Sequence, residues 1–277
     1  MGCPFVTIYL FLFPNHVSNV GFQLSFLISF ILIISSRYQW VRELSNFKQL
    51  LFYSVLCNIS SIPILSYHFF EFSSFGILAN ILLVPIFSVV IFPLIILLLL
   101  SSFVLPNKLN ILLYISKIII GIFHQIILAF NQLKNWNYVT GRLPALFYLL
   151  LSLLLLKFLL KLENRQLPKI SDVLLFIILI SYHWWNPMGV VGMIDVGQGD
   201  SIFIKEPFKQ SVVLIDTGGR MDFTKEEWRR SETSSHLSER TVIPSLKAQG
   251  IKEIDHAIIT HPDTDHVGEL PIIASQL

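Results

Sequence analysis

Long apolar runs fill the first two thirds of the chain and limit what it can fold into. A helix needs roughly 20 apolar residues to cross a bilayer core, because every backbone N–H and C=O group must be hydrogen-bonded within the segment. Stretches that meet or approach this length occupy residues 20–36, 51–70, 75–105, 109–130, 144–161 and 172–186. Since 53% of the residues are hydrophobic and only 14% are charged, we predict a multi-pass α-helical membrane domain of about six helices.

The stretch 75–105 is too long for one straight span and contains Pro85 and Pro93, each of which removes a helical hydrogen bond. Two interpretations stay open. Either a short buried or re-entrant piece precedes a full helix, or the whole run crosses once. A further apolar stretch at residues 5–13 is compatible with part of another helix.

Lysine and arginine residues in the short loops predict the orientation, because such loops carry an excess of positive charge on the cytoplasmic side. If each stretch crosses once, eight basic residues flank one side, while only Lys134 and Arg142 flank the other. The eight are Arg37, Arg42, Lys48, Lys108, Lys157, Lys161, Arg165 and Lys169. The region after residue 187 is therefore expected outside the cytoplasm. A double crossing by 75–105 would invert the downstream part and weaken this bias, so we prefer the single crossing.

Several polar residues interrupt the apolar part. They are Gln23, Asn80, Lys117 and His124. One interpretation is that they bond neighbouring helices, or that Lys117 extends to the interface. The other is that they line a wet passage, since ionisable groups within a membrane often serve function.

The character of the sequence changes near Asn186 and Pro187. Residues 1–187 carry a net charge of +7 and residues 188–277 a net charge of −5. Short apolar runs separated by Gly-containing turns predict strands at 190–195, 201–205, 211–216 and 254–260. A helix is expected at 241–250, ended by Gly250. The charged segment 221–240 is expected to be a solvated loop with a helical piece. The order β-β-β-α-β predicts the opening of an α/β domain.

The segment "HPDTDH" places two histidines and two aspartates in six positions, directly after the last predicted strand. In an irregular loop His261, Asp263, Asp265 and His266 can point to a common centre. Mixed imidazole and carboxylate ligands suit zinc, manganese or iron, and pairs of such ions promote hydrolysis. The alternative is an acidic turn without a metal. We predict a metal site here.

Three more aspartates end strands or turns and could approach the same site. They are Asp195, Asp200 and Asp216. Their alternative role is turn formation, through hydrogen bonds from the backbone to the side chain. Spacing alone does not decide between the two roles.

Taken together, "IDVGQGDSIFI", "LIDTGG" and "VIPSLKAQGIKEIDHAIITHPDTDHVGEL" resemble the metallo-β-lactamase domain of the ComEC family of competence proteins. Upstream, "VGFQLSFLISF" and "SIPILSYHFFEFSSFGILANILLVPIFSVVIFPL" resemble the membrane competence domain of the same family. The resemblance implies a polytopic channel domain over residues 1–187. It also implies the N-terminal, incomplete part of an αββα metallo-β-lactamase-like domain over residues 188–277.

The resemblance further implies a function. Members of the family carry one strand of DNA across the cytoplasmic membrane in natural transformation, and their outer domain is thought to be a nuclease that degrades the other strand. The implied partners are DNA, membrane lipid, a DNA receptor outside and a helicase inside, with a homo-oligomer left open. Two divalent metal ions, zinc or manganese, are implied for the complete protein.

The resemblance also implies roles for individual residues. The His-x-His-x-Asp-His signature of the superfamily falls on residues 261–266, with Asp263 in place of the second histidine. This carboxylate favours manganese or iron over zinc. His261 and Asp263 are implied ligands of one metal, and Asp265 and His266 of a second.

The catalytic role falls on Asp265, which is the implied residue for orienting or deprotonating the attacking water. Asp216 is implied as a supporting residue, with Asp195 and Asp200 as weaker candidates. Further ligands are expected beyond Leu277. We therefore interpret the chain as an internal fragment, and leave open whether it acts as an enzyme alone.

Two other hypotheses stay open. One is a membrane-anchored metallohydrolase acting on a small or lipid substrate, although an anchor needs one helix rather than about six. The other is an inactive truncated remnant of the first. The acidic charge of residues 188–277 argues against a basic nucleic-acid groove in this part, unless bound metals or a further segment offset it.

Overall fold

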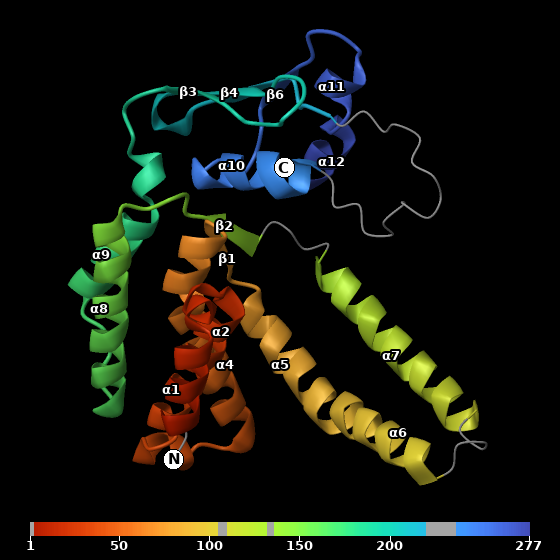
Figure 1. The fold of residues 1–277 in the computed structure, drawn as a ribbon. Coiled ribbons are helices and arrows are strands. Elements are labelled where there is room, and N and C mark those ends of the chain that lie inside the picture. The colour runs from red at the N-terminus through yellow and green to blue at the C-terminus, as the bar shows by residue number, and fades with distance from the viewer. Residues whose placement is uncertain (1–2, 105–109, 132–135, 220–236) are drawn as a thin grey trace. The chain divides into compact units, whose positions relative to one another are not determined.

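The computed structural model describes residues 3–104, 110–131, 136–219 and 237–277 (Figure 1). These residues form two compact units, each built from separate segments of the chain. The first unit comprises Met1–Ser25, Ile62–Phe72 and Tyr138–Leu277, and the second comprises Phe26–Ser61 and Ser73–Asn137. All the predicted metal ligands therefore belong to the first unit.

Each predicted apolar stretch contains a helix. In chain order these are α1 (Cys3–Leu12), α2 (Val20–Ser35), α4 (Asn46–His68), α5 (Gly76–Ile86), α6 (Phe92–Val104), α7 (Asn110–Asn131), α8 (Ala145–Glu163) and α9 (Ile170–Ile180). A short helix, α3 (Gln39–Arg42), precedes α4. Among the described residues, four helical segments are long and apolar enough to cross a membrane. They are Asn46–His68, Gly76–Ser101, Leu112–Phe130 and Ala145–Glu163. The helices Val20–Ser35 and Ile170–Ile180 are apolar but shorter.

The stretch with two prolines, for which two interpretations were open, is helical from Gly76 to Val104. A π-helical turn, Phe87–Ile91, joins α5 to α6 without an intervening loop. Pro85 lies inside α5 and Pro93 near the start of α6. A π turn bonds each N–H to the carbonyl five residues back. This change of bonding pattern lets the helix continue past a proline, which has no N–H to donate. Among the described residues the run is therefore one continuous helix, whose hydrogen-bonding pattern changes at Phe87–Ile91, and it shows no separate preceding piece.

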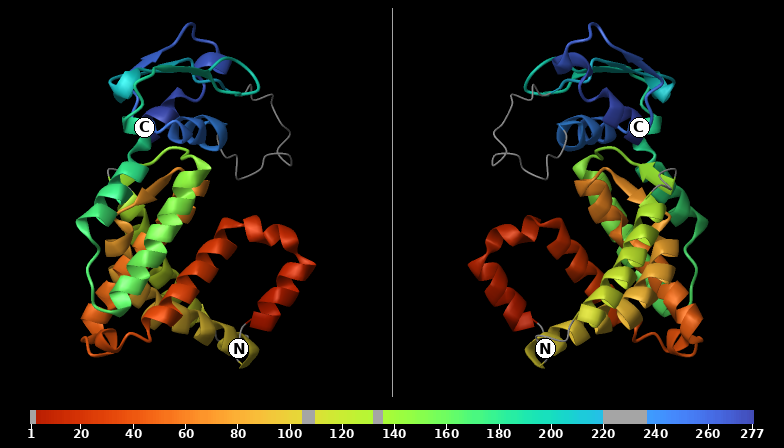
Figure 2. Two further views of the ribbon diagram at one scale, coloured as in Figure 1. Left: turned by 90° about the vertical axis from the view of Figure 1, so that its left-hand side faces the viewer. Right: turned by 90° about the vertical axis from the view of Figure 1, so that its right-hand side faces the viewer.

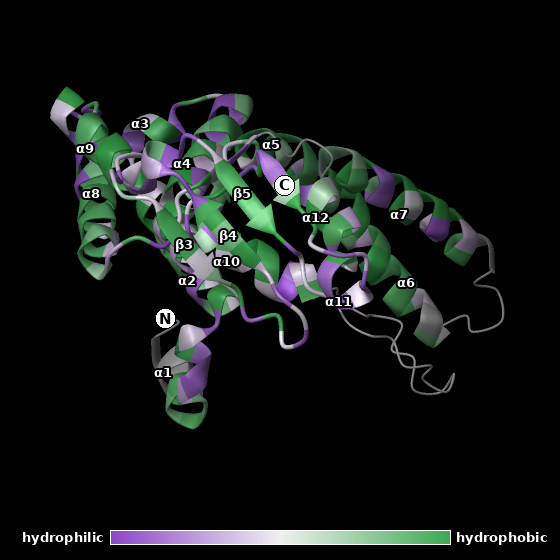
Figure 3. Cartoon of the chain, turned by 90° about the horizontal axis from the view of Figure 1, so that it is seen from above, coloured by the Kyte–Doolittle hydropathy of each residue, from purple (hydrophilic) through white to green (hydrophobic). Residues whose placement is uncertain are grey.

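The helices of the second unit expose apolar side chains. Only 6% of the window in Gly76–Ser101 is buried, and the same holds for Leu112–Phe130. Green, the colour of hydrophobic residues, covers most of α5, α6 and α7 in Figure 3. Such a surface is stable in hydrocarbon rather than in water, so these segments match a lipid environment.

Two helices of the first unit pack against each other. Leu143, Leu151, Leu179 and Ile180 form a buried cluster that joins α8 to α9. At the end of α8, Lys157 and Lys161 each approach Asp172 of α9 with a distance of 2.6 Å between nitrogen and oxygen. These ion pairs hold the C-terminal end of α8 to the start of α9.

The short strands β1 (Glu71–Ser73) and β2 (Asn137–Val139) pair as a two-stranded sheet.

A four-stranded sheet forms the C-terminal part of the first unit. Its strands β3 (Val190–Met193), β4 (Ile202–Lys205), β5 (Val212–Ile215) and β6 (His256–Ile258) follow one another in order. β3 pairs antiparallel with β4 and β4 with β5, whereas β6 pairs parallel with β5. The helices of this part are α10 (Ile243–Ala248), α11 (Thr264–Val267) and α12 (Leu270–Gln276). The parallel pair brings the chain back through α10, as in a β-α-β crossover.

The core of this part lies on one face of the sheet. Phe203 and Leu214 of the strands pack with Val242, Leu246 and Ile273. Both views in Figure 2 show α10 and α12 on the same face of the sheet. A sheet with helices on one face is the arrangement expected of the first half of a layered α/β domain.

The expected strands and helix are found in the expected order. The predicted strand at 254–260 is shorter, at residues 256–258, and the predicted helix 241–250 is preceded by a π-helical segment, Ser238–Val242. The charged segment 221–240 falls mostly outside the described residues. The fold is a helical region with candidate membrane spans followed by a sheet-containing C-terminal domain. The boundary at residue 187 stays a prediction.

Candidate metal centre

The metal centre predicted from the sequence lies where the chain leaves β6. His261 follows that strand, Asp263 is the N-cap residue of α11, and Asp265 and His266 lie within the single turn of α11. Asp263 adopts an extended conformation before the turn. The switch from strand to helix within a few residues folds the two histidines toward each other.

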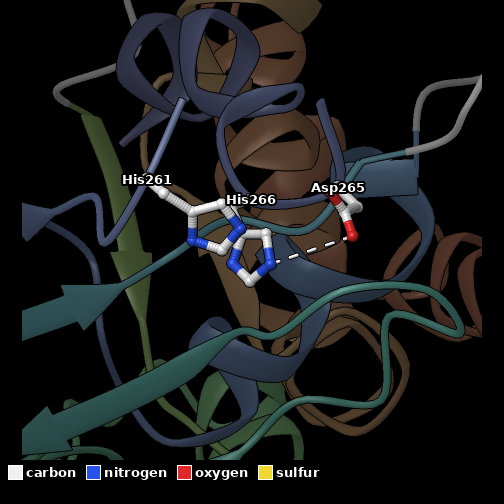
Figure 4. Close-up of side chains that lie close together, drawn as sticks. All are labelled: His261, Asp265 and His266. Atoms are coloured by element: carbon white, nitrogen blue, oxygen red, sulfur yellow. Dashed lines mark ion pairs between the residues drawn. The ribbon is translucent and has the colours of Figure 1, made fainter. Parts of the chain in front are cut away.

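Three of the four predicted ligands converge (Figure 4). One possible ligand atom from each of His261, Asp265 and His266 lies within 4.8 Å of the others. The imidazole rings of the two histidines have centroids 3.7 Å apart, and Nε2 of His266 lies 3.8 Å from Oδ2 of Asp265. With bonds of about 2.2 Å, two ligands of one ion lie at most about 4.4 Å apart. Small side-chain rotations therefore suffice for these three residues to hold one divalent ion.

The fourth predicted ligand stands at the edge. Oδ2 of Asp263 lies 3.4 Å from Nε2 of His261, and its side chain is 71% exposed. Asp263 is not part of the three-residue group. The structure therefore brings it beside His261 without directing it to the centre that Asp265 and His266 share.

Asp216 holds the histidine that is most buried. Its carboxylate accepts hydrogen bonds from the backbone N–H of Thr260 (2.8 Å), from the Thr260 hydroxyl (2.6 Å) and from Nδ1 of His266 (2.9 Å). Because a carboxylate can only accept here, Nδ1 of His266 carries a proton, and in the neutral imidazole the lone pair is then on Nε2. Asp216 thus leaves Nε2 of His266 available to a metal.

The same network selects the tautomer of His261. The Thr260 hydroxyl has one proton, which it donates to Asp216, so Nδ1 of His261 at 3.0 Å must donate to the Thr260 oxygen. Nε2 of His261 then also keeps its lone pair. One threonine and one aspartate therefore prepare both imidazoles as ligands.

The network shifts the acidity of its members. Burial alone would raise the pKa of Asp216, but the hydrogen bonds from Thr260 and His266 lower it below its ordinary value. The hydrogen bond to Asp216 raises the pKa of His266 against the opposing effect of burial, and the charges of Asp265 and Asp200 act in the same direction. The hydrogen bond between the two residues thus favours a carboxylate on Asp216 and a proton on His266.

The other two aspartates differ in role. Oδ1 of Asp195 accepts a hydrogen bond from the backbone N–H of Gly197 at 3.1 Å, which is a turn-forming contact. Asp200 accepts from the backbone N–H of Gly218 through its own carbonyl, and its side chain is exposed. Asp200 acts on the histidine through charge, whereas Asp195 stabilises a loop.

Two glycines that the sequence analysis did not single out let the loops approach α11. A Cβ atom on Gly199 would lie 1.8 Å from the carbonyl oxygen of Asp265, and one on Gly219 would lie 1.8 Å from that of Thr264. Gly199 also has a positive φ of 78°. The sequence signal that could have identified these two glycines is their position in "VGQGD" and "TGG", beside the predicted aspartates.

Thr260 and Thr217 were also missed. Thr217 donates from its backbone N–H (2.8 Å) and from its hydroxyl (2.9 Å) to the carbonyl oxygen of His266. Both threonines directly adjoin a predicted site residue in the sequence. Threonine is common at the ends of strands, however, so the residue type alone does not identify these two as part of the site.

The donors present fit a divalent cation, since two imidazoles and a carboxylate share one centre supported by a buried acid. Helical spans followed by a sheet that carries this cluster define a class of membrane proteins with a metallo-β-lactamase-type domain. Comparison with known proteins agrees: the family described as "Competence protein" matches residues 3–165, and the "Metallo-beta-lactamase superfamily" matches residues 194–277. The chain belongs to the competence protein family.

One relative shows the extent of the match. The chain is 34% identical over 269 residues to "ComE operon protein 3" of Bacillus subtilis (strain 168), which covers 94% of the chain and 34% of that protein. The chain thus spans about a third of the length of this relative. No solved structure matches the chain. The match of residues 194–277 to the metallo-β-lactamase superfamily implies binding of a divalent metal. The apolar helices and the competence protein family make this a membrane protein.

Proposed function

We propose that the chain is part of a transporter that brings one strand of DNA across the cytoplasmic membrane in natural transformation, and that its C-terminal domain is a metal-dependent nuclease acting on the other strand. The observation that carries this proposal is the joining, in one polypeptide, of a competence membrane region to the cluster of His261, Asp265 and His266. A membrane anchor alone would not need several long apolar segments.

The nuclease domain is placed outside the cytoplasm in this proposal. Support comes from the distribution of charge along α8 and α9. Lys157, Lys161 and Asp172 gather where α8 ends and α9 begins, whereas α9 leads into the sheet from its other end. Because basic flanks favour the cytoplasm, we take the shorter apolar helix α9 as a crossing helix and place the sheet on the opposite side.

His261, Asp265 and His266 would hold the metal. A divalent ion there supplies Lewis acidity toward a phosphodiester and makes water nucleophilic at neutral pH. Asp265, whose side chain is 26% exposed, orients the water and accepts its proton. Asp216 keeps His266 in the required tautomer, and Asp263 beside His261 supplies a further carboxylate for a second ion. Two ions, zinc or manganese, remain our proposal for the complete protein.

The partners follow from the same proposal. A receptor outside the cell delivers duplex DNA to the outer domain, and a helicase inside pulls the surviving strand. Self-association of the membrane region into a channel belongs to the same scheme.

The test uses the protein of full length with Asp265→Ala. We expect loss of divalent-dependent cleavage of DNA, while thermal unfolding and membrane insertion stay at the wild-type level. Cleavage at the wild-type rate would remove Asp265 from the mechanism. Uptake of labelled single strands into transformable cells tests the transport half separately, and a wild-type protein that neither cuts nor transfers DNA would end the proposal.

A further inference from the structure

A pocket with two arginines lies in the first unit, apart from the metal ligands. Its volume is about 400 Å³, within the range of sites that enclose a small molecule or one unit of a polymer, about 300–1,000 Å³. Its polar and aromatic lining includes Phe70, Arg142, Arg240, Thr241, Ser245 and Gln249. No acidic side chain is among the described residues that line it.

One wall of the pocket is a single helical face. From Arg240 to Gln249, the lining residues recur with helical spacing, while Val242 and Leu246 on the other face are buried in the core. Both ends of this segment are fixed by buried groups. Glu269 accepts from the backbone N–H and the hydroxyl of Ser238 (3.1 and 2.6 Å), and Lys205 donates to the carbonyl oxygen of Gln249 (2.8 Å). The wall is therefore held in place before any ligand binds.

Arg142 forms the facing side. Its backbone N–H donates to the carbonyl oxygen of Ala248 (2.7 Å), and its carbonyl oxygen accepts from Nε2 of His183 (3.0 Å). Its guanidinium carbon lies 5.4 Å from the centre of the Phe70 ring. The backbone contacts fix the residue, while the exposed guanidinium stays available.

Within the part of the chain that the structure describes, no acid pairs with the two guanidinium groups. The nearby carboxylate of Glu71 is already paired with Lys247, with 2.6 Å between oxygen and nitrogen. Among the described residues, neither Arg142 nor Arg240 forms an ion pair with an acid. An arginine fork matches the geometry of a phosphate, and the hydroxyls of Thr241 and Ser245 add further donors. An anion is the ligand that this lining recognises.

We propose that the pocket binds a phosphodiester of single-stranded DNA, with the adjoining base against the ring of Phe70. This inference rests on the proposed function, since it gives the transferred strand a docking point on the outer side. An aromatic ring next to arginine is a typical platform for single-stranded nucleic acid, because each base offers a π face. Arg142 is also one of two basic residues in the flanks predicted to lie outside, where the orientation of the helices does not account for a positive charge.

The test measures binding without cleavage. The full-length protein in nanodiscs, with EDTA present, is titrated with a short fluorescent single strand, and anisotropy is read at several salt concentrations. We expect the double variant Arg142→Ala with Arg240→Ala to weaken binding about tenfold or more. The slope of log K against log salt should fall in magnitude by about 0.7, because one phosphate contact of a single strand is lost. Ser245→Asp should weaken binding as well. Lys252→Ala, a basic residue of the same domain outside the pocket lining, is the matched control and should leave both quantities unchanged.

The outcomes separate the pocket from the proposed function. If the wild type binds the strand and the double variant binds it equally well, the pocket assignment is wrong while the function stands. If the wild type does not bind single strands at all, both fall. If the double variant binds soluble short-chain phosphatidylglycerol more weakly than the wild type but binds DNA equally well, the pocket serves a lipid headgroup and the proposal is overturned. Thermal unfolding of Ser245→Asp and of the double variant verifies that each is folded.

Discussion

Nδ1 of His266 donates to Oδ2 of Asp216 over 2.9 Å, and the two residues are 50 positions apart in the chain. This hydrogen bond joins the residue after β5 to the turn of α11, so the end of that strand sets the orientation of a proposed metal ligand. Asp216 itself is 3% exposed and has a positive φ of 54°. A non-glycine residue in that conformation is strained, and strain of this kind tends to persist at functional sites.

Asp216→Asn is expected to weaken metal binding by about 10-fold to 100-fold, as loss of a partner behind a metal-ligating histidine typically does. The amide can still accept from Thr260 but no longer carries the negative charge that stabilises His266. Isothermal titration of the full-length protein with Zn²⁺ and Mn²⁺ measures the effect. Asp195→Asn, at an exposed turn, is the control and should bind with wild-type affinity. Equal affinity in both variants would show that Asp216 does not support a metal ligand.

Gly199→Ala is expected to destabilise the C-terminal domain more than Gly197→Ala. Both glycines have a positive φ, 78° and 77°, so the conformational penalty of alanine is about the same, on the order of 1 kcal/mol. A methyl group on Gly199 also meets the carbonyl of Asp265 at 1.8 Å, whereas one on Gly197 meets nothing within 4 Å. Overpacking of this kind adds about 1–3 kcal/mol. Thermal unfolding of the two variants gives the comparison, and equal melting temperatures would contradict the close approach of the two loops.

The sequence predicted the order of strands and the identity of the converging histidines because both depend on local patterns. Short apolar runs between Gly-containing turns located β3, β4 and β5, and the ligand-rich turn located His261 and His266. Contacts across the fold were not accessible in this way. Thr260 gives no signal in a strand-end context, yet its hydroxyl determines which nitrogen of His261 is free.

The membrane stretch with two prolines shows the same limit. A proline predicts a broken helix because it lacks the backbone N–H that donates in the helix. Here the chain forms a π turn at Phe87–Ile91 and stays helical. Whether a helix ends at a proline or shifts its bonding pattern depends on the packing around it, and the positions of prolines in the sequence do not reveal that packing.

The Asp263 side chain shows the same limit. Its spacing from Asp265 suggested a common centre, but the extended backbone of Asp263 turns its side chain outward.

Lys205→Met is expected to change how the stability of the C-terminal domain depends on pH. Lys205 is 2% exposed, and burial lowers its pKa below 10.5. The unfolded chain therefore binds more protons than the folded one between the lowered pKa and about 10.5, so the free energy of unfolding rises with pH across that window. Methionine carries no proton and removes this rise.

Unfolding of the detergent-solubilised protein, followed by intrinsic fluorescence at pH 7.5 and pH 9.5, measures the difference. The wild type should gain stability relative to Lys205→Met as the pH increases. Lys252→Met, whose side chain is 33% exposed, should follow the wild type. A wild type and a Lys205→Met variant with parallel profiles would mean that the buried ammonium is not desolvated as the structure indicates.

Reporter fusions test the orientation on which the proposed function depends. Alkaline phosphatase is active only outside the cytoplasm, so we expect activity when it is fused after Leu277 and none when it is fused after Gln166, in the loop between α8 and α9. Green fluorescent protein at the same two positions should give the opposite pattern, because it folds in the cytoplasm. The reason is the basic cluster of Lys157 and Lys161 beside that loop, which translocates poorly. Phosphatase activity at Gln166 with none at Leu277 would place the metal centre inside the cell, where it could not act on incoming duplex DNA, and the division of labour between an outer nuclease and a membrane channel would have to be abandoned.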